Sequence, residues 1–330
     1  MLHLDDRWVW DFWFARDHGK YHVFYLQAPR ALGDPDARHR NATIGHAVST
    51  DLRQWTLRPD ALGPGAAGQW DDLATWTGSV IEHGGVWWMF YTGISTRDDG
   101  CVQRIGLATS TDLIHWTKDD ANPLLTVDPQ WYEQYDPAVW HEEAWRDPWV
   151  FHNPATDDFR MLICARANHG LADGRGVVGQ ARSSDLRRWK ALPPVTDSGE
   201  FGHLEVPQLI EIDGVWYLVF SVYEWAHADV RQARTPAVAG THYMVADQPL
   251  GPFSALTDEF LAGDRHGSRY AGKLLWDPDG QLVYMAFSQY PDGPDTDFHG
   301  ELSDPVPVRV LDSGHLVLDD GLPFGNGLIT

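Results

Sequence analysis

Short runs of β-branched and aromatic residues recur along the chain in pairs. The second run of each pair is strongly apolar, and the turn before it carries Gly, Asp or Asn residues of the kind that join hairpin strands. No segment shows the sustained 3.6-residue period of an amphipathic helix. The pattern predicts an all-β protein with five hairpins, at residues 11–27, 77–93, 147–166, 205–222 and 270–289.

A second motif lies between these hairpins. The pattern Gly-x-Ala-x-Ser-x-Asp-Leu-x-x-Trp begins at Gly45, Gly106 and Gly179, and a degenerate fourth copy ends at Phe253. Its Asp is expected to accept a hydrogen bond from the backbone two residues on, which fixes a turn. Repeated four-stranded units arranged radially form a propeller, which protects its sheet edges by closure. We therefore predict one five-bladed β-propeller domain over residues 1–330; two separate β-domains are the structural alternative.

The innermost strand of each propeller blade lines the central channel, and the first strand of each hairpin is the candidate for that place. The starts of these strands should then be equivalent in space around one axis. These positions hold Asp11, Thr77 to Ser79, Asp147, Glu205 and Tyr270. Burying unpaired carboxylates in a β core is expensive, so three acids at five equivalent positions indicate a functional site. A pair of carboxyl groups flanking a bond is what glycosidic hydrolysis requires, but their geometry is not visible in the sequence.

Composition narrows the range of partners. The formal net charge of −22 argues against nucleic acid or an anionic membrane as a partner, since both need a basic footprint. Seventeen Trp residues predict flat rings in the core and at a ligand site. The start of the chain has no signal peptide, and no stretch is long enough to cross a membrane, so we expect a cytoplasmic protein. The oligomeric state is left open.

No metal or cofactor is expected. Cys101 and Cys164 have no zinc-type spacing, and no ordered calcium loop is present. His46, His115 and His203 are scattered, and each is interpreted as a structural residue rather than a ligand.

Several segments resemble the catalytic propeller of glycoside hydrolase families 32 and 68, which include invertases, levanases and levansucrases. VWDFW is similar to the motif around the family 68 nucleophile, WRDPWVF contains the Arg-Asp-Pro triplet of both families, and HLEVPQL is similar to their acid motif. TWTGSV resembles a Trp-Ser-Gly-Ser segment. The resemblance runs through nearly the whole chain, at residues 9–13, 75–80, 90–93, 103–116, 145–151, 203–209, 269–280 and 305–318.

The resemblance implies a role for each acid. Asp11 would be the nucleophile, Asp147 the transition-state stabiliser and Glu205 the general acid/base. It also implies that Arg146 either bonds the sugar or pairs with an acid, that Trp76 and Ser79 line the sugar pocket, and that Gln27 contacts the sugar. The strand pattern adds Tyr270, and strict alternation places Trp13 on the side of Asp11 with Trp10 opposite, so that Trp10 reaches the sugar only if the chain bends.

The chain also departs from these families. Family 32 proteins usually carry a C-terminal β-sandwich, which is not expected here because the sequence stops before one could form. Asp11 lacks the neighbouring Asn and Pro of family 32, Glu205 is followed by Val, and Gln27 is one place away from the usual Gln spacing. These departures bear on the substrate more than on the chemistry.

The resemblance implies a retaining β-fructofuranosidase acting on sucrose or short fructo-oligosaccharides. Three alternatives stay open at this point. They are an inverting arabinofuranosidase or xylosidase of the family 43 type, a fructosyltransferase, and a propeller that binds sugar without catalysis. A carboxyl separation of about 5 to 5.5 Å would indicate retention, and one of about 6.5 to 9.5 Å inversion.

Overall fold

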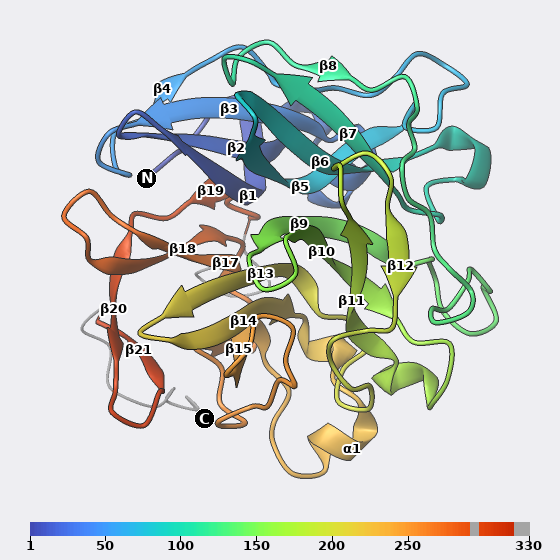
Figure 1. The fold of residues 1–330 in the computed structure, drawn as a ribbon, viewed down its shortest axis with the longest axis vertical. Coiled ribbons are helices and arrows are strands. Elements are labelled where there is room, and N and C mark those ends of the chain that lie inside the picture. Colours follow the sequence, from blue (N-terminus) through green and yellow to red (C-terminus); the bar gives the residue numbers. More distant parts are fainter. Residues whose placement is uncertain (291–296, 320–330) are drawn as a thin grey trace.

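The protein is known from a computed structural model that describes residues 1–290 and 297–319. Its strands form five antiparallel sheets, arranged as blades around a common axis (Figure 1). This arrangement confirms the predicted five-bladed β-propeller. The described residues build these blades and their connections, and contain no additional β-sandwich.

The strands follow one another within each blade in chain order. The first blade contains β1 (Arg7–Asp17), β2 (Lys20–Pro29), β3 (Thr43–Ser49) and β4 (Thr56–Leu57). The second contains β5 (Ala74–His83), β6 (Val86–Ile94), β7 (Arg104–Ser110) and β8 (Thr117–Lys118). The third contains β9 (Trp145–Asn153), β10 (Asp158–Arg166), β11 (Gly176–Ser183) and β12 (Lys190–Leu192). The fourth contains β13 (Glu205–Ile212), β14 (Val215–Val222), β15 (Ala239–Ala246) and β16 (Ala262–Asp264). The fifth contains β17 (Arg269–Trp276), β18 (Leu282–Ser288), β19 (Glu301–Leu302), β20 (Val306–Val310) and β21 (Leu316–Leu318).

The first strands of the blades form the inner ring. Strand β1 contacts β5, β5 contacts β9, β9 contacts β13, β13 contacts β17, and β17 returns to β1. The N-terminal segment closes this ring, because the Leu2 and Leu302 backbones pair and the Val9 amide donates to the Gly300 carbonyl at 2.8 Å. The N-terminus accordingly lies beside β19 in Figure 1.

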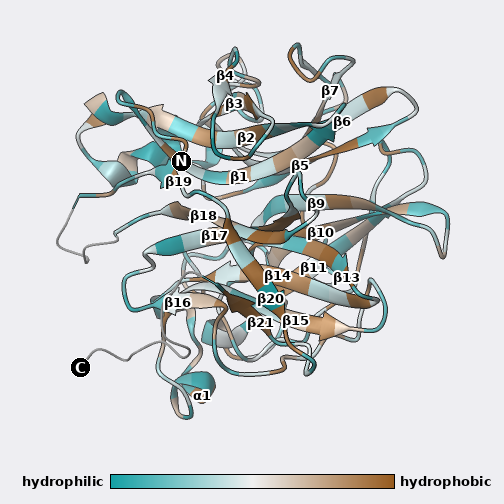
Figure 2. Ribbon diagram, turned by 90° about the vertical axis from the view of Figure 1, so that its left-hand side faces the viewer, coloured by the Kyte–Doolittle hydropathy of each residue, from teal (hydrophilic) through white to brown (hydrophobic). Residues whose placement is uncertain are grey.

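Helical segments are short and lie in the connections. They are η1 (Arg30–Leu32), η2 (Pro35–Asn41), η3 (Thr96–Asp98), η4 (Ala172–Gly174), η5 (Glu224–Ala226) and α1 (Asp229–Gln232). No helix among the described residues has the length and apolar character needed to cross a bilayer. Hydrophobic residues concentrate along the strands, and the connecting loops are mostly hydrophilic (Figure 2). The apolar core lies largely between neighbouring blades.

The repeated Ser-x-Asp-Leu motif forms the turn after the third strand of three blades, as predicted. In the first copy, Asp51 accepts hydrogen bonds from the backbone amides of residues 53 and 54 at 2.9 and 2.8 Å. The same pattern recurs at Asp112 and Asp185. The Leu after each Asp is buried and has a positive φ of 61 to 63°. The motif therefore combines a turn with an apolar residue that packs into the core.

Each inner strand carries a β-bulge near its start. The pairing register shifts at Asp11, at Thr77, between Arg146 and Trp149, after Glu205 and after Tyr270. Four residues at these shifts have positive φ: Asp11 (24°), Asp147 (59°), Val206 (52°) and Ala271 (50°). A bulge bends its strand and re-aims the side chains around it. The five bulges lie where the strands approach the propeller axis, so they control which side chains face it.

The bulge at Thr77 requires a glycine next to it. A Cβ on Gly78 would lie 2.0 Å from the Phe90 carbonyl oxygen in β6, and backbone cannot yield as a flexible side chain can. We expect Gly78→Ala to lower the free energy of unfolding by about 1 to 3 kcal/mol, the usual range for overpacking. Gly63→Ala is the matched control, because its Cβ would meet only Thr43 Cγ2 at 3.9 Å. Equal urea midpoints for the two variants would contradict this account of Gly78.

Candidate active site

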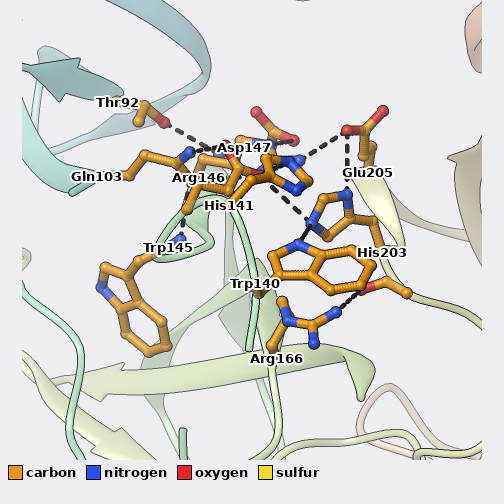
Figure 3. A network of polar contacts seen from close by, with 12 residues as sticks. Thr92, Gln103, Trp140, His141, Trp145, Arg146, Asp147, Arg166, His203 and Glu205 are labelled. Atoms are coloured by element: carbon orange, nitrogen blue, oxygen red, sulfur yellow. Dashed lines mark hydrogen bonds and ion pairs between the residues drawn. The ribbon is translucent and has the colours of Figure 1, made fainter. Parts of the chain in front are cut away.

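A cavity of about 280 Å³ opens where the five inner strands begin. It is lined by residues from all five blades, and Asp11, Asp147 and Glu205 are all among them. The structure thus brings the three sequence-predicted acids together. Figure 3 shows Arg146 close to Asp147 and in contact with Glu205.

Arg146 joins most of the acidic groups of the cavity. Its Nη1 donates to Glu142 Oε1 and its Nη2 to Glu205 Oε1, both at 2.6 Å. Its Nε lies 3.7 Å from Asp147 Oδ2. Gln103 supports the arrangement by accepting from Arg146 Nη1 at 3.1 Å and donating to Glu142 Oε2 at 2.6 Å. The planar guanidinium suits this role, because its donors lie in a fixed fork.

Asp11 lies at the bulge of β1 and faces β5. Thr77 Oγ1 donates to Asp11 Oδ2 at 2.6 Å. Burial raises the pKa of Asp11 to about 6, and the hydrogen bond from Thr77 opposes that rise. Thr77 and Asp11 occupy equivalent positions in neighbouring blades, and the Thr77 hydroxyl therefore orients the Asp11 carboxyl.

Asp147 is buried and held by two strands. The Val206 amide of β13 donates to Asp147 Oδ2 at 2.9 Å, and the Asp147 amide donates to Thr92 Oγ1 at 3.0 Å. Burial raises the pKa of Asp147 to about 7, although the Arg146 charge works in the other direction. Asp11 and Asp147 thus both titrate closer to neutrality than an exposed aspartate does.

Glu205 is held at both carboxyl oxygens. Tyr270 Oη donates to Oε2 at 2.5 Å, and Arg146 holds Oε1. The Tyr270 ring stacks on Tyr223 with a centroid distance of 4.2 Å, and Tyr223 stacks in turn on Trp225 at 6.1 Å. These rings, with η5, form an aromatic wall from the cavity floor to its rim, where Trp225 is half exposed.

Trp10 and Trp13 lie on the opposite sides of β1 from those predicted. Trp10 lines the cavity, whereas Trp13 is buried and stacks on Phe24 at 6.2 Å. The prediction assumed unbroken alternation, but the bulge at Asp11 inserts an extra residue and shifts the later side chains to the other face. The assignment of Trp13 to the sugar is therefore corrected.

Of four other residues that were predicted to contact the sugar, two lie outside the cavity and two line it. Ser79 is buried between blades and accepts from the Val150 amide at 3.0 Å, and Gln27 is buried and donates to Thr43 Oγ1 at 3.3 Å. Neither lines the cavity, because both point into packed strands. Trp76 and Tyr270 do line it, and the Trp76 indole donates to the His39 carbonyl at 2.7 Å.

Sequence reasoning missed part of the cavity wall. Arg38 and His39 reach the cavity from η2, a connection between β2 and β3 that carries no motif. His203 was interpreted as a scattered structural residue, yet it lines the cavity two positions before Glu205. Its position within HLEVPQL was the one signal that could have revealed it.

One cluster of side chains in the cavity wall contains the donor atoms that a metal ion would need. His141, Glu142 and His203 place their ligand atoms within 4.8 Å of one another. However, Glu142 is already paired with Arg146 and Gln103, and His203 Nε2 accepts from the Trp140 indole at 2.9 Å. A cation would have to displace these contacts beside a guanidinium, so the cluster fits a hydrogen-bond network better than a metal centre.

The raised pKa of Asp11 predicts a pH-dependent stability difference. A folded pKa of about 6 against an ordinary value of 3.8 means that the folded state holds this proton more tightly, so the contribution is stabilising below pH 3.8 and is lost as pH rises through 6. At pH 8 the free energy of unfolding of Asp11→Asn should therefore exceed that of the wild type by about 1 to 3 kcal/mol. This gain should shrink toward pH 4. Thermal melts across this pH range measure it, with the exposed Asp312→Asn as control; a gain that is constant with pH would contradict the assignment.

Known proteins resemble this chain in sequence and in fold. The glycosyl hydrolases family 32 N-terminal domain matches residues 13–318. A probable sucrose-6-phosphate hydrolase of Psychromonas ingrahamii is 28% identical over 286 residues, which cover 84% of this chain and 47% of that protein. The raffinose invertase of Escherichia coli is 28% identical over 284 residues, which cover 84% of this chain and 54% of that protein. This chain spans about half the length of these curated relatives.

A solved structure shares the fold. The inulosucrase from Halalkalicoccus jeotgali bound to kestose has a TM-score of 0.76 and 22% identity, and the match covers 96% of this chain and 87% of that one. At this identity the likeness concerns the fold alone. The family match, in contrast, extends over nearly the whole chain and includes Asp147 and Glu205. This chain therefore belongs to glycosyl hydrolase family 32.

Proposed function

We propose that the protein hydrolyses terminal β-fructofuranosyl linkages in sucrose or short fructo-oligosaccharides. The observation that carries the proposal is the convergence of Asp11, Asp147 and Glu205 on one cavity at the propeller axis. Glycosidic hydrolysis needs two carboxyl groups at one bond, and this cavity holds them at the starts of β1 and β13. The relatives named as a sucrose-6-phosphate hydrolase and a raffinose invertase support the same chemistry.

The proposed mechanism retains the anomeric configuration. Asp11 attacks the anomeric carbon while Glu205 gives a proton to the leaving oxygen, so that a covalent fructosyl–Asp11 ester forms as the aglycone departs. Glu205 then takes a proton from water, which attacks the same carbon and releases fructose and the Asp11 carboxylate. Thr77 orients Asp11, and Tyr270 with Arg146 orients Glu205.

Asp147 is assigned to transition-state stabilisation. The Val206 amide holds Oδ2 of its carboxyl, and Oδ1 does not take part in that hydrogen bond. A carboxyl in this place bonds sugar hydroxyls and stabilises the positive charge that develops on the ring. Arg146 keeps the neighbouring acids from repelling one another, and Trp76 supplies a flat apolar face for the sugar.

The cavity size favours a short substrate. Its volume of about 280 Å³ lies just below the roughly 300 to 1,000 Å³ typical of small-molecule sites. A cavity of this size on the axis of a propeller admits a chain end more readily than the middle of a polymer. Cleavage of a terminal unit follows from this shape.

A substrate panel tests the proposal. The protein is incubated with sucrose, inulin, levan and an aryl arabinofuranoside, and released sugar is measured, with the anomer of the first-formed fructose followed by NMR. We expect hydrolysis of sucrose with β-fructofuranose formed first. Cleavage of the arabinoside alone, or formation of the inverted anomer, would favour the family 43 type of chemistry. Fructose missing from the products while oligosaccharides grow would indicate transfer, and sugar binding without turnover would indicate a binding propeller.

A further inference from the structure

His203 lies against Glu205 at the rear of the cavity. It precedes β13, is only 2% exposed, and places its ring between Trp140 and Glu205 (Figure 3). Its Nδ1 lies 3.8 Å from Glu205 Oε1, and its Nε2 lies 3.3 Å from Glu142 Oε1. A buried imidazole beside the proposed acid/base is not used by the mechanism described above.

The contact with Trp140 determines which ring nitrogen carries the proton. An indole N–H can only donate, and Trp140 Nε1 lies 2.9 Å from His203 Nε2. His203 Nε2 is therefore the acceptor and carries no proton. Burial, together with the charges of Arg146 and Arg166, holds the pKa of His203 well below its usual value, so the ring is neutral. The single ring proton is consequently on Nδ1, the nitrogen that faces Glu205.

Trp140 is itself fixed from behind. The Arg166 guanidinium lies over its ring at 3.5 Å from the centroid. Arg166 in turn donates to Glu133 Oε1 and to the Gly202 carbonyl, each at 2.8 Å. A rigid chain of contacts thus leads from Glu133 through Arg166 and Trp140 to the His203 ring.

The Nδ1–H of His203 has no hydrogen-bond partner among the described residues, although it is buried. Leaving a buried donor unpaired is costly. The titratable and charged groups around the ring are Glu142, Glu205, Arg146, Arg166 and His141. Of these, Glu205 is the acceptor nearest to Nδ1.

We propose that His203 is a positioning residue for Glu205, whose Nδ1–H donates to Glu205 Oε1 once that carboxyl has given its proton to the leaving sugar. The inference rests on the proposed function. The proton that moves is the one on Glu205, which goes to the leaving oxygen; the His203 proton stays on Nδ1 throughout. The added hydrogen bond stabilises the carboxylate that must then accept a proton from water.

Two substitutions of His203 separate this role from simple packing. The amide nitrogen of Asn occupies the place of Nδ1, and that of Gln the place of Nε2. His203→Gln should lower kcat/KM on sucrose by about 10- to 100-fold, and His203→Asn by several-fold at most, if one charge-assisted hydrogen bond of the usual strength is lost in the first case alone. On β-fructosyl fluoride, whose leaving group needs no proton, the formation of the fructosyl–enzyme should be nearly unaffected in both variants.

The pH profile supplies a readout that packing alone would not move. Loss of the Nδ1–H donor destabilises the ionised acid, so the alkaline limb of kcat/KM on sucrose should move to higher pH by about half a unit to one unit in His203→Gln. It should stay near the wild-type position in His203→Asn. Equal losses in both variants, on both substrates and with an unmoved limb, would overturn the proposal. The exposed His18→Gln is the control.

The tautomer can also be observed directly, without any substitution at His203. Histidine-selective ¹⁵N labelling of the wild type should show a neutral ring protonated at Nδ1 that changes in Trp140→Phe, since this variant removes the donor to Nε2. A His203 ring protonated at Nε2 in the wild type would overturn the proposal even if the His203 variants fail to fold. Because this measurement needs no substrate, a failure of the proposed function on the sugar panel is distinguishable from a failure of this inference.

Discussion

Glu205→Ala and Asp11→Ala are both expected to lose nearly all activity on sucrose, but to respond differently to azide. Loss of the general acid/base should lower kcat by about 10²- to 10⁴-fold, and loss of the nucleophile should cost at least as much. Both acids line the cavity, so both variants open space in which a small anion can bind. The anomer of the azide product then reports which acid was removed.

The stereochemistry follows from the faces that the two acids occupy. In Glu205→Ala, Asp11 still forms the fructosyl ester from the α-face, and azide attacks it from the β-face to yield β-fructosyl azide. In Asp11→Ala, azide takes the place of the missing carboxylate and yields the α-anomer. The exposed Glu259→Ala is the control and should behave as the wild type. Products with the two anomers exchanged would reverse the assigned roles, and would do so whatever the size of the rate losses.

The sequence was sufficient to predict the propeller and the place of its acids, for a physical reason. Hairpin turns and apolar strands are local features, and the Ser-x-Asp-Leu turn repeats with its own hydrogen bonds at Asp51, Asp112 and Asp185. Asp11 and Asp147 interrupt strands that are otherwise apolar, so they stood out as residues that a packed core would not retain without use. Closure of the ring then brings together positions that are equivalent in each blade.

The side chains around the acids could not be predicted in the same way. The bulge at Asp11 depends on how β1 pairs with β2. The register shift at this bulge turns Trp10 toward the cavity and Trp13 away from it. Ser79 lies beyond the bulge at Thr77, so it points between blades instead of into the cavity. His203 gains its place from Trp140, which is distant in sequence, so no local pattern reveals it. Non-local pairing therefore limits such predictions more than strand propensity does.

Replacing Arg146 should have the largest effect on stability. The side chain is buried and contacts Glu142 and Glu205 at 2.6 Å, with Asp147 nearby. Removal of one partner from a buried ion pair usually costs about 3 to 5 kcal/mol, because the other charge is left without compensation. Arg146→Met should lower the free energy of unfolding by about this amount at pH 8. Activity on sucrose should also fall strongly, since Glu205 loses the contact that orients it.

The pH dependence distinguishes lost charge compensation from lost packing. Without the guanidinium, the neighbouring carboxyls favour their protonated forms, so the destabilisation should be smaller at pH 5 than at pH 8. Urea unfolding of the wild type and Arg146→Met at both pH values measures this difference. Adding Glu142→Gln to Arg146→Met should recover part of the stability at pH 8, because it removes one of the unpaired charges. A loss that is the same at both pH values, and that Glu142→Gln does not reduce, would mean that Arg146 acts by filling space rather than by holding the acids of the cavity together.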